Sequence, residues 1–376
     1  MVPIMATHEI RIDRSLPLAG EPHTGHNRWH PDIPPAVRCE PGDEVVLETR
    51  DTFDGAFDRQ SGSKSVEGVD FGLVHPLTGP VFVAGAEPGD LLVAETLEVI
   101  PESFGFTAHV PGFGFLRRDF PEPYLVKWEL AGGWATSDDV PGVRIAGAPF
   151  MGVIGVAPSR ALLEAANARE ADLAARNPDD PVLLPEPSGA VPSDPVIAAE
   201  ALRTVPPREH GGNIDIKQLT AGTRILLPVS VEGALFSAGD AHFAQGDGES
   251  CGTAIEMAAT LRVRLDLRKG QAAERGIRTL CWERDDPGPA EASPPARYFA
   301  TTGICVDRDG RNEFEDLTLA ARNALDAMIR HLTHEYGYTA QQAYTICSVA
   351  VDLKISQAVD VPNVIVSAFL PLDIFI

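Results

Sequence analysis

The stretch EPGDEVVLET at residues 40–49 recurs as EPGDLLVAET at residues 87–96, with Glu, Pro-Gly-Asp, an apolar run and Glu-Thr at matching offsets. Each copy joins a Pro-Gly turn to a run of strand-forming residues, which predicts a tight turn followed by a β-strand. A weaker third copy, TAGTRILLPVSVEG, occupies residues 220–233. Two or three such turn–strand units favour a β-sandwich or a β-barrel.

Other segments extend this pattern. Strands are also expected at FMGVIGVA (150–157), at TLRVRLDL (260–267), where apolar and polar residues alternate, and in the C-terminal run VIVSAFLPLDIFI. Helices are expected in two regions only. ALLEAANAREADLAAR (161–176) predicts a marginal helix, and DLTLAARNALDAMIRHLTHEYG (316–337) has one apolar face, with a capping-box pattern beginning just after it.

These segments predict a β-rich α+β fold with a β-sandwich or barrel-like core and a C-terminal α/β part. We expect three parts along the chain. Residues 1–159 form a β-rich N-terminal part, and residues 160–205 form a helical and irregular insertion, with a largely irregular stretch at 177–195. Residues 206–376 form an α+β C-terminal part that carries the main cluster of polar residues.

Composition limits the possible partners. The 376-residue chain has a formal net charge of −23 and contains 32 proline and 34 glycine residues. Such acidity repels nucleic acid phosphates and anionic lipid, so we expect neither nucleic acid nor membrane as a partner. The N-terminal residues lack the apolar core of a signal peptide, and the five cysteines form no C-x-x-C pair. We therefore expect a cytoplasmic protein with reduced thiols.

The densest polar cluster is GDAHFAQGDGESCG at residues 239–252. Asp240 and His242 are two residues apart, so on a strand both side chains project from the same face. Carboxylate and imidazole together are typical ligands of zinc or another divalent ion. The alternative is an exposed turn whose acidic residues are merely solvated.

Two further segments offer candidates for the same pocket. Asp215 lies between Ile214 and Ile216, so on a strand it faces away from them, either into the pocket or into solvent. His75 lies in VHPLTGPVF, a loop that two prolines make rigid. A single loop histidine is, however, often only a surface residue or a local hydrogen-bond donor.

A serine mechanism is a competing hypothesis. Gly248-Glu249-Ser250-Cys251-Gly252 matches the G-x-S-x-G nucleophile elbow. The elbow needs a strand before it and a helix after it, whereas here a Gly/Asp-rich turn comes first and a strand-like run follows. Neither a P-loop nor a strand-borne G-x-G-x-x-G occurs, which argues against nucleotide chemistry.

Four strings together resemble the acetamidase/formamidase family: HPLTGPVFVAGAEPGD, PPREHGGNIDIKQLTAGTRILLPVSVEGALFSAGDAHFAQGDGE, GTAIEM and ICSVAVDLKISQAVDVPNVIVSAFLP. The resemblance runs from about Asn27 to Phe375. It implies hydrolysis of a small linear amide to a carboxylate and ammonia by a β-rich enzyme with an α/β part. It also implies a homo-oligomer and, as in some relatives, a divalent metal ion. Insertion 160–205 resembles the formamidase-like branch and SVAVDLKISQAVDVPN the acetamidase-like branch, so the substrate stays open.

Chemistry suggests metal ligands among the polar positions that match the family. A metal ion polarises an amide carbonyl and lowers the pKa of a water molecule, and histidine and carboxylates hold such an ion with one position open. We expect Asp215, Asp240 and His242 as ligands, with His75 as a fourth ligand or a neighbour of the ligands. Zinc is the first candidate.

The same chemistry suggests proton-transfer and orienting groups. Amide cleavage needs a group that first takes and then returns a proton, and Glu249 is our candidate. Asn213, with the backbone N–H groups around Gly211 and Gly212, is expected to stabilise the oxyanion. Glu256 is a further catalytic candidate, or it orients a ligand. The alternatives are a serine-type amidase that uses Ser250, and a non-catalytic β-sandwich that binds a metal or a sugar.

Overall fold

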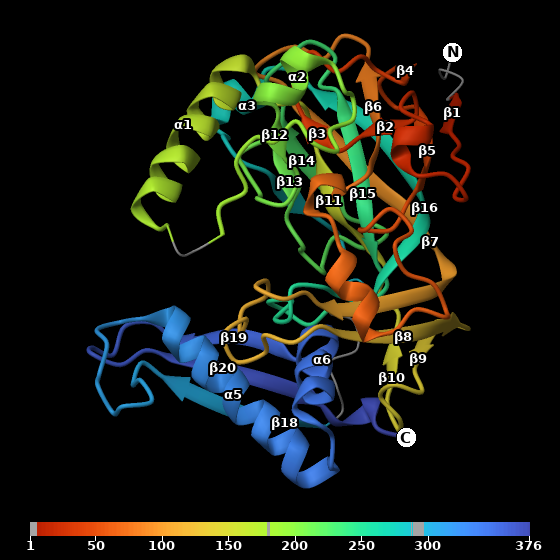
Figure 1. Cartoon of the computed structure of the whole chain (residues 1–376). Helices are drawn as coiled ribbons and strands as arrows, with labels where there is room; N and C mark the ends of the chain where they lie inside the picture. Colours follow the sequence, from red (N-terminus) through yellow and green to blue (C-terminus); the bar gives the residue numbers. More distant parts are fainter. Residues whose placement is uncertain (1–5, 179–180, 287, 289–296) are drawn as a thin grey trace.

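The computed structural model describes residues 6–178, 181–286, 288 and 297–376. Within these residues, the strands form three sheets, of fifteen, three and two strands. The fifteen-stranded sheet makes up the upper body in Figure 1, and the three-stranded sheet with its helices lies beneath it, in blue. None of the helices in the described ranges is long and apolar enough to cross a membrane.

The fifteen-stranded sheet draws on residues from the N-terminus to residue 283. Its strands are β1 (Thr7–Ile10), β2 (Gly25–His26), β4 (Val37–Cys39), β5 (Glu44–Thr49), β6 (Leu77–Val83), β7 (Leu91–His109), β8 (Tyr124–Ala131), β9 (Trp134–Thr136), β10 (Arg144–Ala146), β11 (Phe150–Gly155), β13 (Gly211–Asn213), β14 (Arg224–Pro228), β15 (Phe236–His242), β16 (Glu256–Arg268) and β17 (Cys281–Glu283). The two-stranded sheet pairs β3 (Arg28–Trp29) with β12 (Leu202–Arg203).

The echoed turn–strand units are confirmed. In each EPGD turn the aspartate carboxylate accepts the N–H of the glutamate three residues earlier, Glu40 to Asp43 at 3.0 Å and Glu87 to Asp90 at 2.9 Å. The glycine of each turn has a positive φ, which glycine adopts at little cost. The strands that follow, β5 and β7, lie on either side of β16, and the strand of the third copy, β14, pairs with β7. The repeat therefore builds neighbouring strands of one sheet.

Strand β16 shows why this sheet forms. Its residues alternate, so that Leu261, Val263 and Leu265 are buried while Arg262 and Arg264 face outward. The two arginines form ion pairs with glutamates on the flanking strands β5 and β7. Burial on one face and charge pairing on the other together fix the register.

The β-rich expectation is confirmed, but the barrel form is not. The strand order runs β10-β9-β8-β7-β16-β15-β11-β13, with the remaining strands on branches, and it does not close on itself. The large sheet also crosses the division expected at residue 206, because β15 and β16 pair with β6, β5 and β7 from the N-terminal part.

The C-terminal unit is an antiparallel sheet with helices. Strand β20 (Ile365–Pro371) pairs antiparallel with both β18 (Tyr298–Ile304) and β19 (Asp352–Gln357). Helix α5 (Leu317–Tyr336) covers this sheet and ends at Gly337 in the left-handed conformation. Helix α6 (Ala340–Ala350) follows with the expected capping box. Because the strands are antiparallel, this unit is α+β, as expected for residues 206–376, and the description of it as an α/β part was wrong.

The insertion is partly as expected. Helix α1 (Arg160–Arg176) forms, and the residues after it are irregular up to α2 (Pro195–Glu200), apart from residues 179–180, which lie outside the described ranges. The expectation of only two helical regions was wrong, because α2 and α3 (Gln271–Arg275) also form. The irregular stretch is anchored, because the buried guanidinium of Arg28 donates to the carbonyls of Glu186 and Ser188.

Candidate active site

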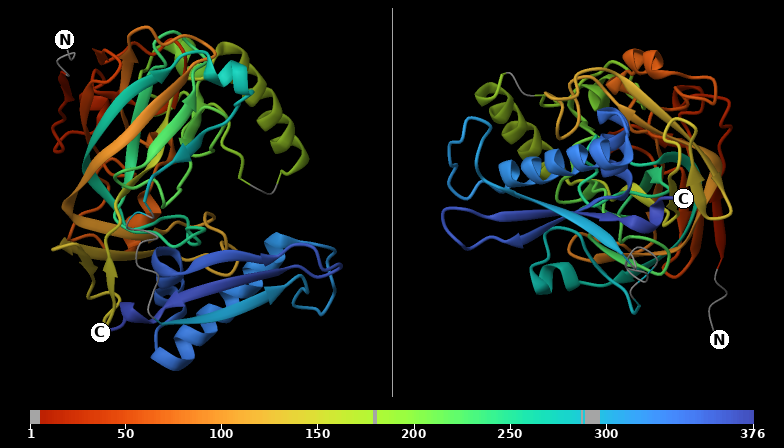
Figure 2. Two further views of the ribbon diagram at one scale, coloured as in Figure 1. Left: turned by 180° about the vertical axis from the view of Figure 1, so that it is seen from behind. Right: turned by 90° about the horizontal axis from the view of Figure 1, so that it is seen from below.

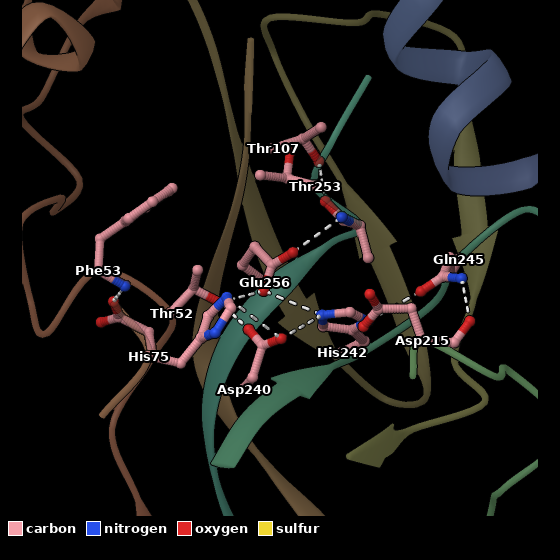
Figure 3. A network of polar contacts seen from close by, with 12 residues as sticks. Thr52, Phe53, His75, Thr107, Asp215, Asp240, His242, Gln245, Thr253 and Glu256 are labelled. Atoms are coloured by element: carbon pink, nitrogen blue, oxygen red, sulfur yellow. Dashed lines mark hydrogen bonds and ion pairs between the residues drawn. The ribbon is translucent and has the colours of Figure 1, made fainter. Parts of the chain in front are cut away.

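The polar cluster lies where β15 runs between β11 and β16 (Figure 3). His242 at the end of β15 pairs directly with Glu256 at the start of β16, and its Nε2 lies 3.2 Å from Glu256 Oε2. Asp240 Oδ2 lies 3.4 Å from the same Nε2. All three residues are at least 97% buried. The sheet thus brings together the pair that the sequence placed on one strand face.

Loops bring in Asp215 and Glu249. Asp215 follows β13, and Glu249 lies in the turn after β15. Donor atoms of Asp215, Asp240 and His242 all lie within 4.8 Å of one another, and the same holds for His242, Glu249 and Glu256. The sequence placed Asp215 on a strand, which was wrong. The residue lies in a loop, and its backbone N–H donates to the carbonyl of Gly152, which holds the loop against β11.

Three of the site carboxylates have strained backbones. The φ angles of Asp215, Asp240 and Glu249 are +45°, +56° and +42°, a region that residues other than glycine rarely adopt. Such strain persists only where the surrounding structure enforces it, and it gathers at functional sites. These carboxylates are therefore aimed by the fold rather than by local preference.

Gly152 in β11 forms the floor of the cluster. The register of β11 on β15 places it opposite Asp240. A Cβ atom built on Gly152 would lie 2.7 Å from Asp215 Oδ1, 2.7 Å from His242 Cε1 and 2.8 Å from Asp240 Oδ2. Any side chain here would fill the space on which the three polar groups converge.

The tautomer of His242 follows from its partners. Its Nδ1–H donates to Gln245 Oε1 at 2.9 Å, and Gln245 Nε2 in turn donates to the backbone carbonyl of Asp215 at 2.8 Å, which fixes the amide orientation. Nε2 therefore faces the carboxylates. Among the described residues, neither this atom nor Asp215 Oδ1 has a hydrogen-bond partner, although both are buried.

Burial disfavours a charged His242, but the neighbouring carboxylates of Glu256 and Asp240 outweigh it and raise the pKa of the imidazole well above its ordinary value. Burial raises the pKa of Asp215 to about 7, and burial together with the charge of Asp215 raises the pKa of Glu249 well above its ordinary value. Burial also tends to raise the pKa of Asp240, but the imidazoles of His75 and His242 outweigh it and lower that pKa. So many buried carboxyl groups ionise together only if a proton or a cation lies among them.

Two residues that the sequence analysis missed support this cluster. The hydroxyl of Thr52 contacts both Asp240 Oδ1 and Glu256 Oε2, and Gln245 fixes the tautomer of His242. Thr52 comes just after β5, and nothing in its local sequence separates it from other loop threonines. Gln245 lies three residues after His242 inside the recognised string, so a search for a partner of the imidazole would have found it.

A cavity of about 120 Å³ opens beside these groups. This volume is well below the roughly 300–1,000 Å³ of pockets for drug-sized ligands, so it suits a molecule of few atoms. The lining of the cavity includes both polar and apolar residues. The lining residues are Thr52, Phe53, Phe71, Val74, His75, Phe113, Val205, Asn213, Asp215, Asp240, Glu249, Gly252 and Glu256.

His75 and Asn213 both line the cavity, but their side chains have other partners than those of Asp240 and His242. His75 Nε2 is 3.8 Å from Asp240 Oδ2, and its Nδ1 is 3.2 Å from the hydroxyl of Thr204. Asn213 was expected to donate to an oxyanion, yet its Nδ2 donates to the carbonyl of Val205 at 3.2 Å, and its buried Oδ1 has no partner among the described residues. The N–H of Gly211 donates to the carbonyl of Arg208 and is not free for an oxyanion.

The serine hypothesis finds no support in this geometry. Ser250 is buried outside the lining of the cavity, and its Oγ contacts no base among the described residues. No helix follows Gly252, because the next element is strand β16. Burial raises the pKa of the adjacent Cys251 thiol to about 11, so it is not a thiolate at neutral pH.

The C-terminal unit holds the turn that carries Glu249. From α6, the hydroxyl of Ser348 donates to the carbonyl of Thr253 at 2.7 Å and accepts the N–H of Cys251 at 3.0 Å. The hydroxyl of Tyr344 donates to the carbonyl of Ser250. The views of Figure 2 show α6 at the junction of the two bodies. This helix therefore fixes the turn from behind without lining the cavity.

This fold and this site define a β-rich enzyme with a buried acid–histidine centre. The chain belongs to the Acetamidase/Formamidase family, whose model matches residues 11–376. It is 41% identical to a formamidase of Methylophilus methylotrophus over 93% of this chain and 89% of the relative. It is 40% identical to an acetamidase of Mycolicibacterium smegmatis over 89% of this chain and 87% of the relative.

A solved structure extends the comparison to the fold. A gamma lactamase from Delftia acidovorans superposes with a TM-score of 0.92 at 39% identity, covering 98% of this chain and 93% of the other. The similarity therefore includes both the large sheet and the C-terminal unit.

Proposed function

We propose that this chain is an amidohydrolase that cleaves a small linear amide to a carboxylate and ammonia, with water as the nucleophile. We also propose that the carboxylate–imidazole cluster binds a divalent cation, for which zinc is the first candidate. Family membership and the relatives named formamidase and acetamidase support the reaction. The small cavity, with a lining of both polar and apolar residues, suits such a substrate.

The main support for a bound cation is the convergence of ligand atoms next to Gly152. Asp215, Asp240 and His242 meet there. Nε2 of His242 lies 3.4 Å from Asp240 Oδ2 and 3.2 Å from Glu256 Oε2, and neither this atom nor the buried Asp215 Oδ1 has a hydrogen bond within the described residues. One nitrogen and two carboxylate oxygens form a donor set that zinc accepts while an open position remains. The residues present therefore fit the ion.

Each neighbouring side chain then has a role. A divalent cation supplies polarisation of the amide carbonyl and a lower pKa for the attacking water. Glu249 takes a proton from that water and returns it to the leaving nitrogen, so that ammonia departs as the C–N bond breaks. Glu256 accepts the N–H of Ala254 at 2.8 Å and contacts the hydroxyl of Thr52, which keeps it beside His242. The unpartnered Oδ1 of Asn213 would accept an N–H of the substrate.

For the fold, we propose that the branched sheet packs on itself as a sandwich. Val45 of β5, Ile225 of β14 and Phe236 of β15 contribute to one continuous hydrophobic core, although β15 lies on the main strand path and β5 and β14 lie off it. Two layers of one sheet that share a core make the arrangement of a sandwich.

We further propose a cytoplasmic homo-oligomer. Ile355, Val359 and Val361 at the far end of the C-terminal sheet are 62%, 76% and 62% exposed, and such clustered apolar residues are typical of subunit contacts. All five cysteines are free, which suits a reducing compartment. Light scattering coupled to gel filtration measures the mass, and a monomer would contradict the oligomer.

The function is tested by ammonia release combined with metal analysis. Purified protein is assayed on formamide, acetamide and propionamide as isolated, after chelator treatment and after readdition of zinc. We expect ammonia from at least one amide, about one metal ion per chain, and loss and recovery of activity with the metal. A metal-free protein with full activity would contradict the proposed role of the cation. No ammonia from any amide would favour the non-catalytic binding protein.

A further inference from the structure

A second, larger hollow adjoins the cavity. It has a volume of about 610 Å³, and its surface is mostly apolar. Phe71, Phe113 and Val205 line both hollows, so the two adjoin at these residues. We call this larger hollow the apolar groove. Its other lining residues are Pro111, Gly112, Arg169, Glu170, Leu173, Pro181, Val182, Leu183, Pro206 and Pro207.

The charged residues of the apolar groove are already paired. Arg169 of α1 forms an ion pair with Glu209, and Glu170 of α1 forms one with Arg208. The side chain of Arg208 is 1% exposed and that of Glu170 is 12% exposed, so these charges satisfy each other and do not invite a charged ligand. What remains for a ligand is the apolar surface of Leu173, the 181–183 segment and the prolines.

The neck between the two hollows is built firmly. The rings of Phe71 and Phe113 lie 5.4 Å apart in a tilted contact. Phe113 is flanked by Gly112 and Gly114, whose φ angles are +80° and +94°, and a Cβ at Gly252 would lie 2.6 Å from its ring. The ring thus packs against the turn that carries Glu249 and lines the cavity.

We infer that the preferred substrate is a primary amide with an extended apolar acyl group, whose amide lies in the cavity and whose acyl chain passes the neck into the apolar groove. This inference rests on the proposed function. The acyl side is chosen because a reaction that releases ammonia leaves the nitrogen unsubstituted, so only the acyl part carries carbon. A cavity of about 120 Å³ holds the amide group, and the groove of about 610 Å³ supplies the apolar surface that a longer chain needs.

The first experiment measures kcat/KM for ammonia release from formamide, acetamide, butyramide and hexanamide. We expect kcat/KM to rise about threefold to fourfold for each methylene beyond acetamide, the gain from burying one methylene. A kcat/KM that is flat or falls with chain length overturns the inference while leaving the amidohydrolase intact. If no amide releases ammonia, the proposed function itself has failed.

The second experiment places a charge in the groove. Leu173→Asp alters the groove wall on the exposed side of α1, where the residue is 41% exposed, and Leu16→Asp is the matched control at a site that is 43% exposed and outside the groove. We expect Leu173→Asp to lower kcat/KM for hexanamide at least tenfold and to leave that for formamide within twofold. The control should change neither. An equal loss of kcat/KM for both amides in Leu173→Asp overturns the inference. A changed native mass of this variant, without a change in chain-length dependence, also overturns it and makes the groove a subunit contact.

Discussion

The large sheet and the C-terminal unit contribute to the same site in different ways. Strands and loops of the sheet body supply every side chain that lines the cavity, including Asp240 and Glu256. None of the described residues of the C-terminal unit lines the cavity, but its helix α6 holds the turn of Glu249 through Ser348 and Tyr344. The sheet body therefore carries the reacting groups, and the C-terminal unit positions one of them, Glu249. Variants in each part test this difference.

The largest effect is expected from His242→Ala in the sheet body. This change removes the nitrogen that faces Asp240 and Glu256, so the buried carboxylates lose their shared partner. We expect bound metal and ammonia release to be lost together, measured by elemental analysis and a discontinuous ammonia assay. His334→Ala, on the exposed end of α5, is the matched control and should keep both. Activity without metal in the His242 variant would remove the cation from the mechanism.

Glu249→Gln tests the reacting group that the C-terminal unit positions. The amide is nearly isosteric but cannot take and return a proton, so kcat should fall about 10²–10⁴-fold while the metal content stays unchanged. Glu232→Gln, at an exposed position, serves as the control. Retained turnover in the Glu249 variant would assign the proton transfer to another carboxylate of the cluster.

These two residues also show how far the sequence could predict the site. The string around Asp240 and His242 was recognisable because a strand places residues two apart on one face. Asp215 was predicted from a strand that does not form, because its positive φ is imposed by contacts with β11 and leaves no mark in the local sequence. The floor at Gly152 depends on the register of β11 against β15, which is a property of the assembled sheet.

In the fold, too, local features could be predicted from the sequence and long-range pairings could not. The EPGD turns and the strands after them were readable, because turn chemistry and alternation are local signals. The pairing of both echoed strands with β16 was not readable, since β16 begins at Glu256, 147 residues after β7 ends at His109. The helix cap at Thr339 was predicted correctly because a capping box is a local motif.

Gly152→Ala tests whether space above β11 is needed. The added methyl group would lie 2.7–2.8 Å from atoms of Asp215, Asp240 and His242, so these groups must move apart. We expect kcat/KM to fall by roughly 10²-fold, as expected for a misplacement of about 1 Å, together with weaker metal binding. Gly62→Ala is the control, because a Cβ there meets nothing within 4 Å. Unchanged activity in Gly152→Ala would show that the space has no role.

Ser348→Ala tests the positioning role of α6. The change leaves the N–H of Cys251 and the carbonyl of Thr253 without their partner, and the turn of Glu249 should loosen. We expect kcat to fall about tenfold with metal content and KM little changed, in the range seen for residues that orient a reacting group. Ser356→Ala in β19 removes a hydroxyl of the same unit that is hydrogen-bonded to Ser367 of β20 and not to the turn of Glu249, and it should have no such effect. A loss of metal in Ser348→Ala would contradict the separation of roles.

Thr339→Ala should give the smallest effect on kcat. It tests whether the start of α6 also helps to position the turn of Glu249. The hydroxyl of Thr339 accepts the N–H of Gln342 at 3.2 Å, and Gln342 Oε1 accepts the N–H of Thr339 at 2.9 Å. Losing this cap should lower the free energy of unfolding by about 1 kcal/mol, a shift of a few degrees at most in a thermal melt. Because the contacts to the Glu249 turn come from Tyr344 and Ser348, beyond the first helical turn, kcat should stay within twofold of the wild type. If Thr339→Ala instead lowered kcat as much as Ser348→Ala, the helix would act on the turn as one rigid rod, and its contacts with the turn would not be separable from its cap.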